Sequence, residues 1–263
     1  MKALITGASS GLGADMARVL VNDGYEVILI ARRKSRLEKI QKELGDKVKI
    51  IVKDISSTYN CMELYKELKG ENIDILINNA GFGICGFFDE TSLDRELDLV
   101  DLNVKSLHTL TKLFYKDFIK KDKGYILNVA SSAGFMPGPL MATYYASKSY
   151  VLNFTLALHE ELRRKNSNVS ISVLCPGPVD TEFNKVARVK FSMRGENSLS
   201  VARYTIKKMF DEKLVIVPTF KMKLVLFFIR FIPRKLLLRM TYKIQERKTR
   251  WRNLLIIMKW MKF

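Results

Sequence analysis

Two adjacent tyrosines, Tyr144 and Tyr145, stand four and three residues before Lys148 in the segment PLMATYYASKSY. A free phenol has a pKa of about 10, so it holds its proton at neutral pH. A nearby ammonium favours the phenolate and typically lowers the phenol pKa by about 1–3 units. Residues three and four apart share one helix face, so either tyrosine could form a proton-transfer pair with Lys148. The alternative is a helix surface carrying an unrelated lysine.

A glycine-rich loop, TGASSGLG, follows the short apolar stretch at the start of the chain and precedes a helix-like segment. Glycines at a strand-to-helix turn let the backbone approach a pyrophosphate, and the helix N-terminus attracts its charge. The spacing T-G-x-x-x-G-x-G differs from the common G-x-G-x-x-G pattern, but its place at the first strand–helix junction predicts a dinucleotide site. The loop residues expected to bind are Gly7, Ser9, Ser10, Gly11, Leu12 and Gly13.

Cations follow the second predicted strand, at Arg32, Arg33, Lys34 and Arg36, and no acid occurs in residues 27–37. A site that prefers NAD carries a carboxylate about 20 residues after the glycines, to bind the ribose hydroxyls. Arginine instead suits a 2′-phosphate, which it holds with paired donors. We therefore predict NADP(H) as the cofactor, with Arg32 and Arg33 at its phosphate; the alternative is a solvated, basic helix start.

The elements that must position these groups alternate between strand-like and helix-like segments. The strand candidates are apolar and lack polar residues at every second position, which predicts burial on both faces of a parallel sheet. We expect strands at 2–6, 26–31, 48–53, 73–77, 124–129, 169–174 and 214–217, with helices that include 13–21, 36–44 and 143–164. The predicted fold is a doubly wound parallel α/β sheet over residues 1–217, followed by a basic, largely helical extension at 218–263.

Over residues 1–217 the chain resembles the short-chain dehydrogenases/reductases, a family of Rossmann-fold oxidoreductases. The motifs that carry the resemblance are the loop at 6–13, Asp54, the run NNAG at 78–81, Asn103, Ser131, Y-x-x-x-K at 144–148 and PGPVDT at 176–181. The resemblance implies a nicotinamide cofactor and interconversion of a ketone and a secondary alcohol. It selects Tyr144 over Tyr145, through the Y-x-x-x-K pattern and the thirteen-residue step from Ser131, whose rival is Ser132.

The resemblance also implies a role for each matching residue. Tyr144 exchanges a proton with the substrate oxygen, Lys148 lowers the tyrosine pKa and binds the ribose hydroxyls, Ser131 orients the substrate, and Asn103 supports a water chain. Asp54 lies near the adenine, Asn78 flanks the cofactor through its backbone, and Thr181 meets the carboxamide. The remaining expected cofactor residues are Ile55, Ala80, Gly81, Pro176, Gly177 and Val179.

The expected substrate is hydrophobic, because apolar residues lie near these motifs in the sequence. They are Phe82, Phe87, Phe88, Phe135, Met136, Leu140, Met141 and Phe183. A basic segment at 183–200, with Lys185, Arg188, Lys190 and Arg194, is expected to cover the substrate. An apolar pocket under a basic lid suits a hydroxysteroid or bile acid, which would place the protein in lipid metabolism. The alternatives are a 3-oxoacyl (fatty acyl) reductase and a non-catalytic NADP-binding protein at a membrane surface.

Positive charge concentrates at the C-terminal end of the chain. Residues 218–263 hold 13 Lys or Arg and one acid, Glu246, so this extension supplies +12 of the net +18. A helical stripe is predicted there, made of Leu237, Met240, Ile244, Trp251, Leu255 and Met258. It could pack on the domain or on another subunit of a homodimer or homotetramer, or lie on an anionic membrane. Nucleic acid is not expected, because no recognition motif accompanies the charge.

Cysteine content and hydropathy bear on location. The three cysteines, Cys61, Cys85 and Cys175, are widely spaced, which predicts reduced thiols and no metal site. We expect no secretory signal, and the longest uncharged apolar run of the extension, residues 224–229, is too short to span a bilayer. We therefore predict a cytoplasmic protein, and the alternative is a protein associated with a membrane.

Overall fold

The computed structural model describes residues 1–187 and 195–260, and in this part of the chain seven parallel strands form one sheet. The strand order is β3-β2-β1-β4-β5-β6-β7, so the direction of winding reverses between β1 and β4. The strands are β1 (Lys2–Thr6), β2 (Glu26–Ala31), β3 (Val48–Val52), β4 (Ile73–Asn78), β5 (Gly124–Val129), β6 (Val169–Leu174) and β7 (Val215–Ile216). The predicted doubly wound fold is confirmed.

Burial on both faces explains the apolar strands. In β1, Ala3 and Ile5 join one core cluster and Leu4 joins the other, because successive side chains point to opposite faces. All three are completely buried. The expected strands end within two residues of the observed ones; β7 is shorter than predicted because only Val215 and Ile216 pair with β6.

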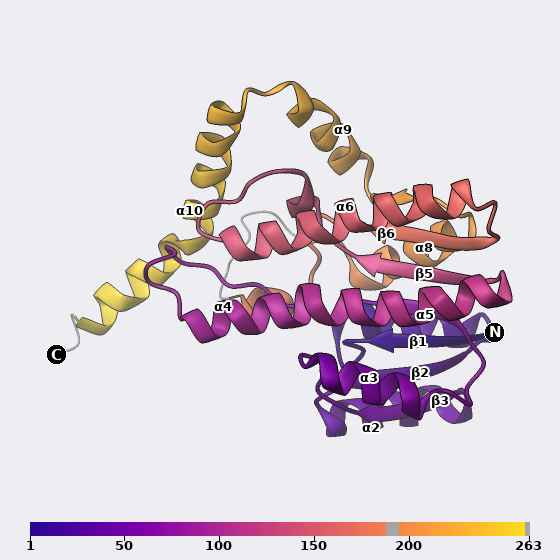
Figure 1. Cartoon of the computed structure of the whole chain (residues 1–263). Coiled ribbons are helices and arrows are strands. Elements are labelled where there is room, and N and C mark those ends of the chain that lie inside the picture. The colour runs from indigo at the N-terminus through magenta and orange to yellow at the C-terminus, as the bar shows by residue number, and fades with distance from the viewer. Residues whose placement is uncertain (188–194, 261–263) are drawn as a thin grey trace.

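Helices cover both faces of the sheet (Figure 1). The helices that pack on one face and contribute to its core cluster are α1 (Gly11–Asn22), α2 (Lys34–Leu44) and α8 (Ser198–Phe210). The opposite face carries α3 (Thr58–Glu67), α5 (Leu107–Lys121) and α6 (Ala142–Arg164). The shorter elements are η1 (Gly45–Lys47), α4 (Leu93–Val100), the π-helical η2 (Asp101–Ser106), η3 (Ser132–Phe135) and α7 (Phe183–Val186).

A buried polar network joins the centre of the sheet to α5 and α6. Asn128 of β5 accepts from Asn78 Nδ2 at 2.9 Å and donates to Thr155 Oγ1 at 3.0 Å. Asn78 also donates to Thr111 Oγ1 at 2.9 Å. These amides and hydroxyls are almost fully shielded from solvent, so each depends on the others for its hydrogen bonds.

The basic extension forms two helices that rise from the domain as an arch above the chain leading into α6 (Figure 1). We call α9 (Phe220–Phe228), η4 (Ile229–Phe231) and α10 (Arg234–Trp260) the C-terminal arch. No helix among the described residues is long and apolar enough to cross a membrane.

The described part of the predicted stripe is not buried as one face. Leu237 is buried, whereas Met240 and Ile244 are exposed. The buried face of α10 instead follows Leu237, Thr241 and Gln245 at steps of four, because this face turns toward the domain. The side chains of Trp251, Leu255 and Met258 lie outside the described residues.

We predict that Asn128→Ala lowers the free energy of unfolding by about 2–3 kcal/mol, because buried partners on β4 and α6 lose hydrogen bonds. Urea denaturation followed by circular dichroism measures the change. The matched control is Asn153→Ala on the exposed face of α6, expected to stay within about 0.5 kcal/mol of the parent. Equal stabilities for the two variants would contradict the network's contribution.

Candidate active site

A cavity of about 520 Å³ opens at the carboxyl ends of the strands, where the winding reverses between β1 and β4. Open α/β sheets bind their ligands at such a switch point. Most of the predicted residues line this cavity, namely Gly7, Ser9, Ser10, Gly11, Leu12, Arg32, Arg33, Asp54, Ile55, Ala80, Gly81, Ser131, Tyr144, Lys148, Pro176, Gly177, Val179 and Thr181. The three that lie outside the lining are Gly13, Asn78 and Asn103.

The glycine loop is built for close backbone contact. Gly7 and Gly11 have φ of 64° and 54°, in the left-handed region that side chains disfavour. A Cβ on Gly7 would lie 2.7 Å from Ala80 Cα, so the loop packs directly on the end of β4. At the start of α1, Ser10 makes no side-chain cap and the first turn carries no acid. The positive end of α1 is therefore available to an anion.

Gly13 contributes to packing instead of the cavity wall. A Cβ there would lie 2.5 Å from Asn79 Nδ2 and 2.6 Å from the Gly7 carbonyl oxygen. Gly13 thus lies behind the loop, and its expected contribution to cofactor binding stays a prediction.

The Asn78 side chain belongs to the buried network and its neighbour Asn79 lines the cavity, so the expected approach of the Asn78 backbone to the cofactor stays a prediction. Asn79 Nδ2 donates to the carbonyls of Thr6 and Gly7 at 3.0 and 3.2 Å. Thr6 Oγ1 in turn accepts from the backbone N–H groups of Asn79 and Ala80 at 3.0 and 3.1 Å. Side chains alternate along a strand, which is why adjacent asparagines face different surroundings.

A cluster of arginines forms one corner of the cavity. Arg33 donates to Ser9 Oγ at 2.9 Å and to Ser10 Oγ at 2.8 Å, which ties it to the glycine loop. Glu182, which the sequence did not single out, accepts from Arg33 at 2.8 Å and from Arg36 at 2.5 Å. These two hydrogen-bonded arginines lower the pKa of Glu182 to about 2. The corner thus already binds one anion, a carboxylate from the loop after β6.

Asp54 sits beside the second predicted arginine. Burial works against its ionisation, but hydrogen bonds from Ser56 and the nearby Arg32 outweigh burial and lower the pKa of Asp54. The Arg32–Asp54 contact is 3.4 Å long and largely exposed, so it contributes little to stability.

Three of the four predicted catalytic residues meet at one wall of the cavity. Ser131, Tyr144 and Lys148 all line it, and Lys148 Nζ lies 5.9 Å from the centre of the Tyr144 ring. Lys148 donates to the Val129 carbonyl at 2.8 Å, at the end of β5. Tyr144 and Lys148 are both buried on α6, which passes over this strand end.

The expected lowering of the Tyr144 pKa is wrong for this structure. Burial is the largest influence and raises the pKa of Tyr144 above its ordinary value, while the Ser131 hydrogen bond works in the opposite direction. Burial also lowers the pKa of Lys148 to about 8. Removal from water disfavours both charged forms, so Tyr144 is neutral at pH 7 and Lys148 titrates close to neutrality.

Tyr145 lines the same cavity but faces a different partner. Its hydroxyl is hydrogen-bonded to Gln245 of α10, a contact between residues 100 positions apart. Its ring covers Gly138, where a Cβ would lie 2.3 Å away. Burial raises the pKa of Tyr145 to about 12.

Asn103 lies behind the cavity, in the π-helical segment η2. It accepts from the Phe82 backbone N–H at 3.0 Å and donates to the Phe82 carbonyl at 2.9 Å and to Ser147 Oγ at 3.1 Å. Ser147 donates to the Tyr144 carbonyl at 2.7 Å, so Asn103 connects two parts of the cavity wall. Its expected support of a water chain stays a prediction.

The apolar wall is smaller than predicted. Phe82, Met141 and Phe183 line the cavity. Phe87 and Phe88 are exposed, while Phe135, Met136 and Leu140 pack in neighbouring clusters. Sequence proximity to a motif does not fix which way a side chain points. Within the predicted basic lid, Arg188, Lys190, Arg194 and the Lys185 side chain lie outside the described residues.

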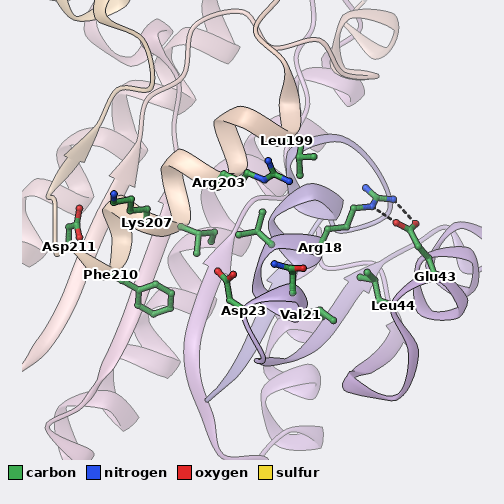
Figure 2. Close-up of a pocket in the computed structure, with 13 residues that line it drawn as sticks. Arg18, Val21, Asp23, Glu43, Leu44, Leu199, Arg203, Lys207, Phe210 and Asp211 are labelled. Atoms are coloured by element: carbon green, nitrogen blue, oxygen red, sulfur yellow. Dashed lines mark hydrogen bonds and ion pairs between the residues drawn. The ribbon is translucent and has the colours of Figure 1, made fainter.

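A second cavity, of about 760 Å³, lies where the ends of α1 and α2 meet α8 (Figure 2). Its lining mixes charges and apolar groups, and Arg18 holds the Glu43 carboxylate with two donors at 2.7 and 2.8 Å. The predicted site residues are all absent from its lining. The smaller cavity is therefore the candidate site. Among the described residues, we find no group of His, Cys, Asp and Glu that could hold a metal ion.

A parallel sheet with a glycine loop at its switch point defines a dinucleotide-binding fold of the Rossmann class. The family model described as short chain dehydrogenase matches residues 1–190. The chain therefore belongs to the short-chain dehydrogenase/reductase family, whose members are oxidoreductases acting on CH–OH and C=O groups. The expected family is confirmed.

Individual relatives agree with this assignment. A bovine very-long-chain 3-oxoacyl-CoA reductase is 31% identical over 194 residues, which cover 71% of this chain and 62% of that protein. The match thus spans less than two thirds of that relative's length.

Two solved structures share the fold. A short-chain dehydrogenase from Sphingobium yanoikuyae in complex with NADPH has a TM-score of 0.77 and 28% identity, over 83% of this chain and 88% of that one. A Burkholderia phymatum member in complex with NAD has a TM-score of 0.78 and 25% identity, over 86% and 91%. Similar structures therefore bind either nicotinamide dinucleotide.

Proposed function

We propose that the protein is an NADP(H)-dependent reductase that converts a ketone on a hydrophobic substrate to a secondary alcohol. The observation that carries the proposal is the meeting of Ser131, Tyr144 and Lys148 in the cavity that the glycine loop also lines. A proton donor and a dinucleotide site within one cavity are what carbonyl reduction needs.

The cavity residues fit a nicotinamide dinucleotide. The positive end of α1 and the loop from Gly7 to Gly13 suit a pyrophosphate, and Arg33 with Ser9 and Ser10 suits a 2′-phosphate. Lys148 and Thr181 border the same cavity and suit the ribose and the carboxamide. When bound, this cofactor supplies or accepts a hydride.

The protonation states support the reductive direction. Because Tyr144 is neutral at pH 7, it carries the proton that a developing alkoxide needs. The positive charge of Lys148 on the same helix face stabilises the phenolate left behind. The Ser131 hydroxyl, which lines the same wall as Tyr144, holds the substrate oxygen in line with the proton. Asn103 positions Tyr144 through Ser147.

The substrate is proposed to be apolar, because Phe82, Met141 and Phe183 line the catalytic end of the cavity. A hydroxysteroid or bile acid fits such a wall. A 3-oxoacyl thioester is the second candidate, favoured by the name of the bovine relative. Turnover confined to small polar sugars or diols would contradict both candidates. A substrate panel followed at the nicotinamide absorbance band separates them.

Assembly and location remain predictions. The family resemblance predicts a homodimer or homotetramer, which analytical ultracentrifugation measures. The three cysteines are buried, and the cytoplasmic location stays a prediction. The division into a catalytic domain at 1–217 and an extension at 218–263 is likewise a prediction.

We expect Tyr144→Phe to lower kcat by at least about a thousandfold, since the substrate oxygen loses its proton donor. Tyr145→Phe is the matched control, because it removes the same atom from the neighbouring residue, and it should retain activity within about tenfold. Steady-state kinetics with NADPH and a ketone panel measure both. Unchanged activity in Tyr144→Phe would support the non-catalytic alternative.

The pKa of Lys148 sets a pH limit for activity. Below about pH 8 Lys148 is cationic, so kcat/KM for NADPH should stay level from about pH 6 to 7 and fall about tenfold per pH unit above 8. Tyr144 stays protonated throughout this range because its pKa is raised. A profile that remains level to about pH 10 would show that the charge on Lys148 is not required.

Cofactor preference is expected to depend on Arg33 and Glu182. Arg33→Ala should raise KM for NADPH on the order of 10- to 100-fold and change KM for NADH little, because a charge-assisted phosphate contact is lost. Glu182→Gln should lower KM for NADPH by about two- to fivefold, since the arginines lose a competing anion at an exposed ion pair. Parallel changes for both cofactors would contradict a 2′-phosphate site. Lys39→Ala on α2 is the control.

A further inference from the structure

The outer face of α9 carries a row of exposed apolar side chains. Phe220, Leu224, Phe227 and Phe228 recur at the spacing of one helix face, and all four are exposed. Phe231 is 72% exposed, and the centre of its ring lies 5.5 Å from the centre of the Phe227 ring. The ring centres of the neighbours Phe227 and Phe228 are 5.4 Å apart. We call these five residues the phenyl face. Clustered exposed aromatics mark an interaction surface.

The domain is not what covers this face. Met222 and Leu226 lie on the opposite side of α9, and with Ile229 of η4 they pack in the core cluster that includes Cys175 and Val217. The intramolecular packing of α9 is thus already complete on its inner side. The arch projects from the domain, with η4 at its apex (Figure 1). No described residue covers the phenyl face, so this face is open to a partner surface.

Charge identifies the kind of partner. Residues 218–245 contain no acid, and exposed cations lie on α9, on η4 and at the start of α10. They include Lys221, Arg230, Arg234, Lys235 and Arg239. A phenyl stripe flanked by lysine and arginine suits the boundary of an anionic bilayer, where rings enter the acyl region and cations meet headgroups.

A second copy of the chain fits this surface less well. A two-fold contact brings the same patch of both subunits together, so the cations of one arch would face those of the other. No acid from residues 218–245 is available to compensate this repulsion. An anionic lipid surface supplies the missing negative charge throughout the contact.

We propose that the C-terminal arch docks the protein on an anionic membrane surface, with the phenyl face in the acyl boundary. The docking does not depend on the proposed reaction. Its inner side nevertheless borders the candidate site: Gln245 binds the Tyr145 hydroxyl, and Met222 lies against Gly177. If the proposed reaction holds, an apolar substrate dissolved in the bilayer would lie close to the cavity.

Vesicle flotation of the full-length protein tests the docking. Neutral vesicles contain phosphatidylcholine alone, and anionic vesicles contain phosphatidylcholine with about one third phosphatidylglycerol. The parent should float with the anionic vesicles, float weakly with neutral ones, and lose binding in about 0.5 M salt. Phe227→Ser with Phe228→Ser and Phe231→Ser should weaken binding on the order of tenfold or more, because the apolar anchor is removed.

Charge-reversal variants distinguish binding through the cations of the arch from binding through the net charge of the whole protein. Lys221→Glu with Arg230→Glu and Arg234→Glu should weaken binding to anionic vesicles by at least about 100-fold, at roughly fivefold or more per cation. The matched control, Lys39→Glu with Lys42→Glu and Lys47→Glu, makes the same charge change on and just beyond α2 and should retain most binding. Circular dichroism verifies that each variant folds.

Three results would overturn the proposal. The parent could fail to float with anionic vesicles, or the α2 control could lose as much binding as the arch variant. The serine variant could also lower the molecular mass in ultracentrifugation while leaving flotation unchanged, which would identify the phenyl face as a subunit contact. Each result is independent of turnover, so it is distinguishable from a failure of the proposed reaction.

Discussion

The site depends on the close approach of two backbone segments, the glycine loop after β1 and the end of β4. Only glycine allows it, because a Cβ on Gly7 would lie 2.7 Å from Ala80 Cα. Thr6 and Asn79 fix the approach with hydrogen bonds in both directions. This contact holds the positive end of α1 at the cavity, beside the strand ends that support Lys148 and Ser131.

Burial then sets the chemistry of the residues around the cavity. Removal from water raises the pKa of Tyr144 and lowers that of Lys148, so both shifts favour the uncharged forms. A neutral phenol next to a lysine that titrates near neutrality is arranged to give a proton in reduction. At the exposed arginine corner the opposite holds, because Arg33 and Arg36 keep Glu182 ionised. One cavity therefore combines a buried wall with an exposed, charged corner.

The sequence predicted features that depend on short stretches of chain. Apolar strands, the glycine loop and the Tyr144–Lys148 spacing each lie within one element or one junction, and the fold they imply is the observed one. Contacts between distant residues could not be predicted: Glu182 meets Arg33 across 149 positions, and Gln245 meets Tyr145 across 100. The sign of the Tyr144 pKa shift was also missed, because burial is a property of the assembled fold and not of helix spacing.

The C-terminal arch shows how one segment can serve two environments. Met222, Leu226 and Gln245 use its inner side, where they pack on the domain and the cavity wall. The outer side leaves aromatic rings in water, which costs free energy unless another surface covers them. The inner side of the same arch borders Tyr145 and Gly177. The proposed docking of the outer side would therefore bring a bilayer close to the helices that form part of the cavity surroundings.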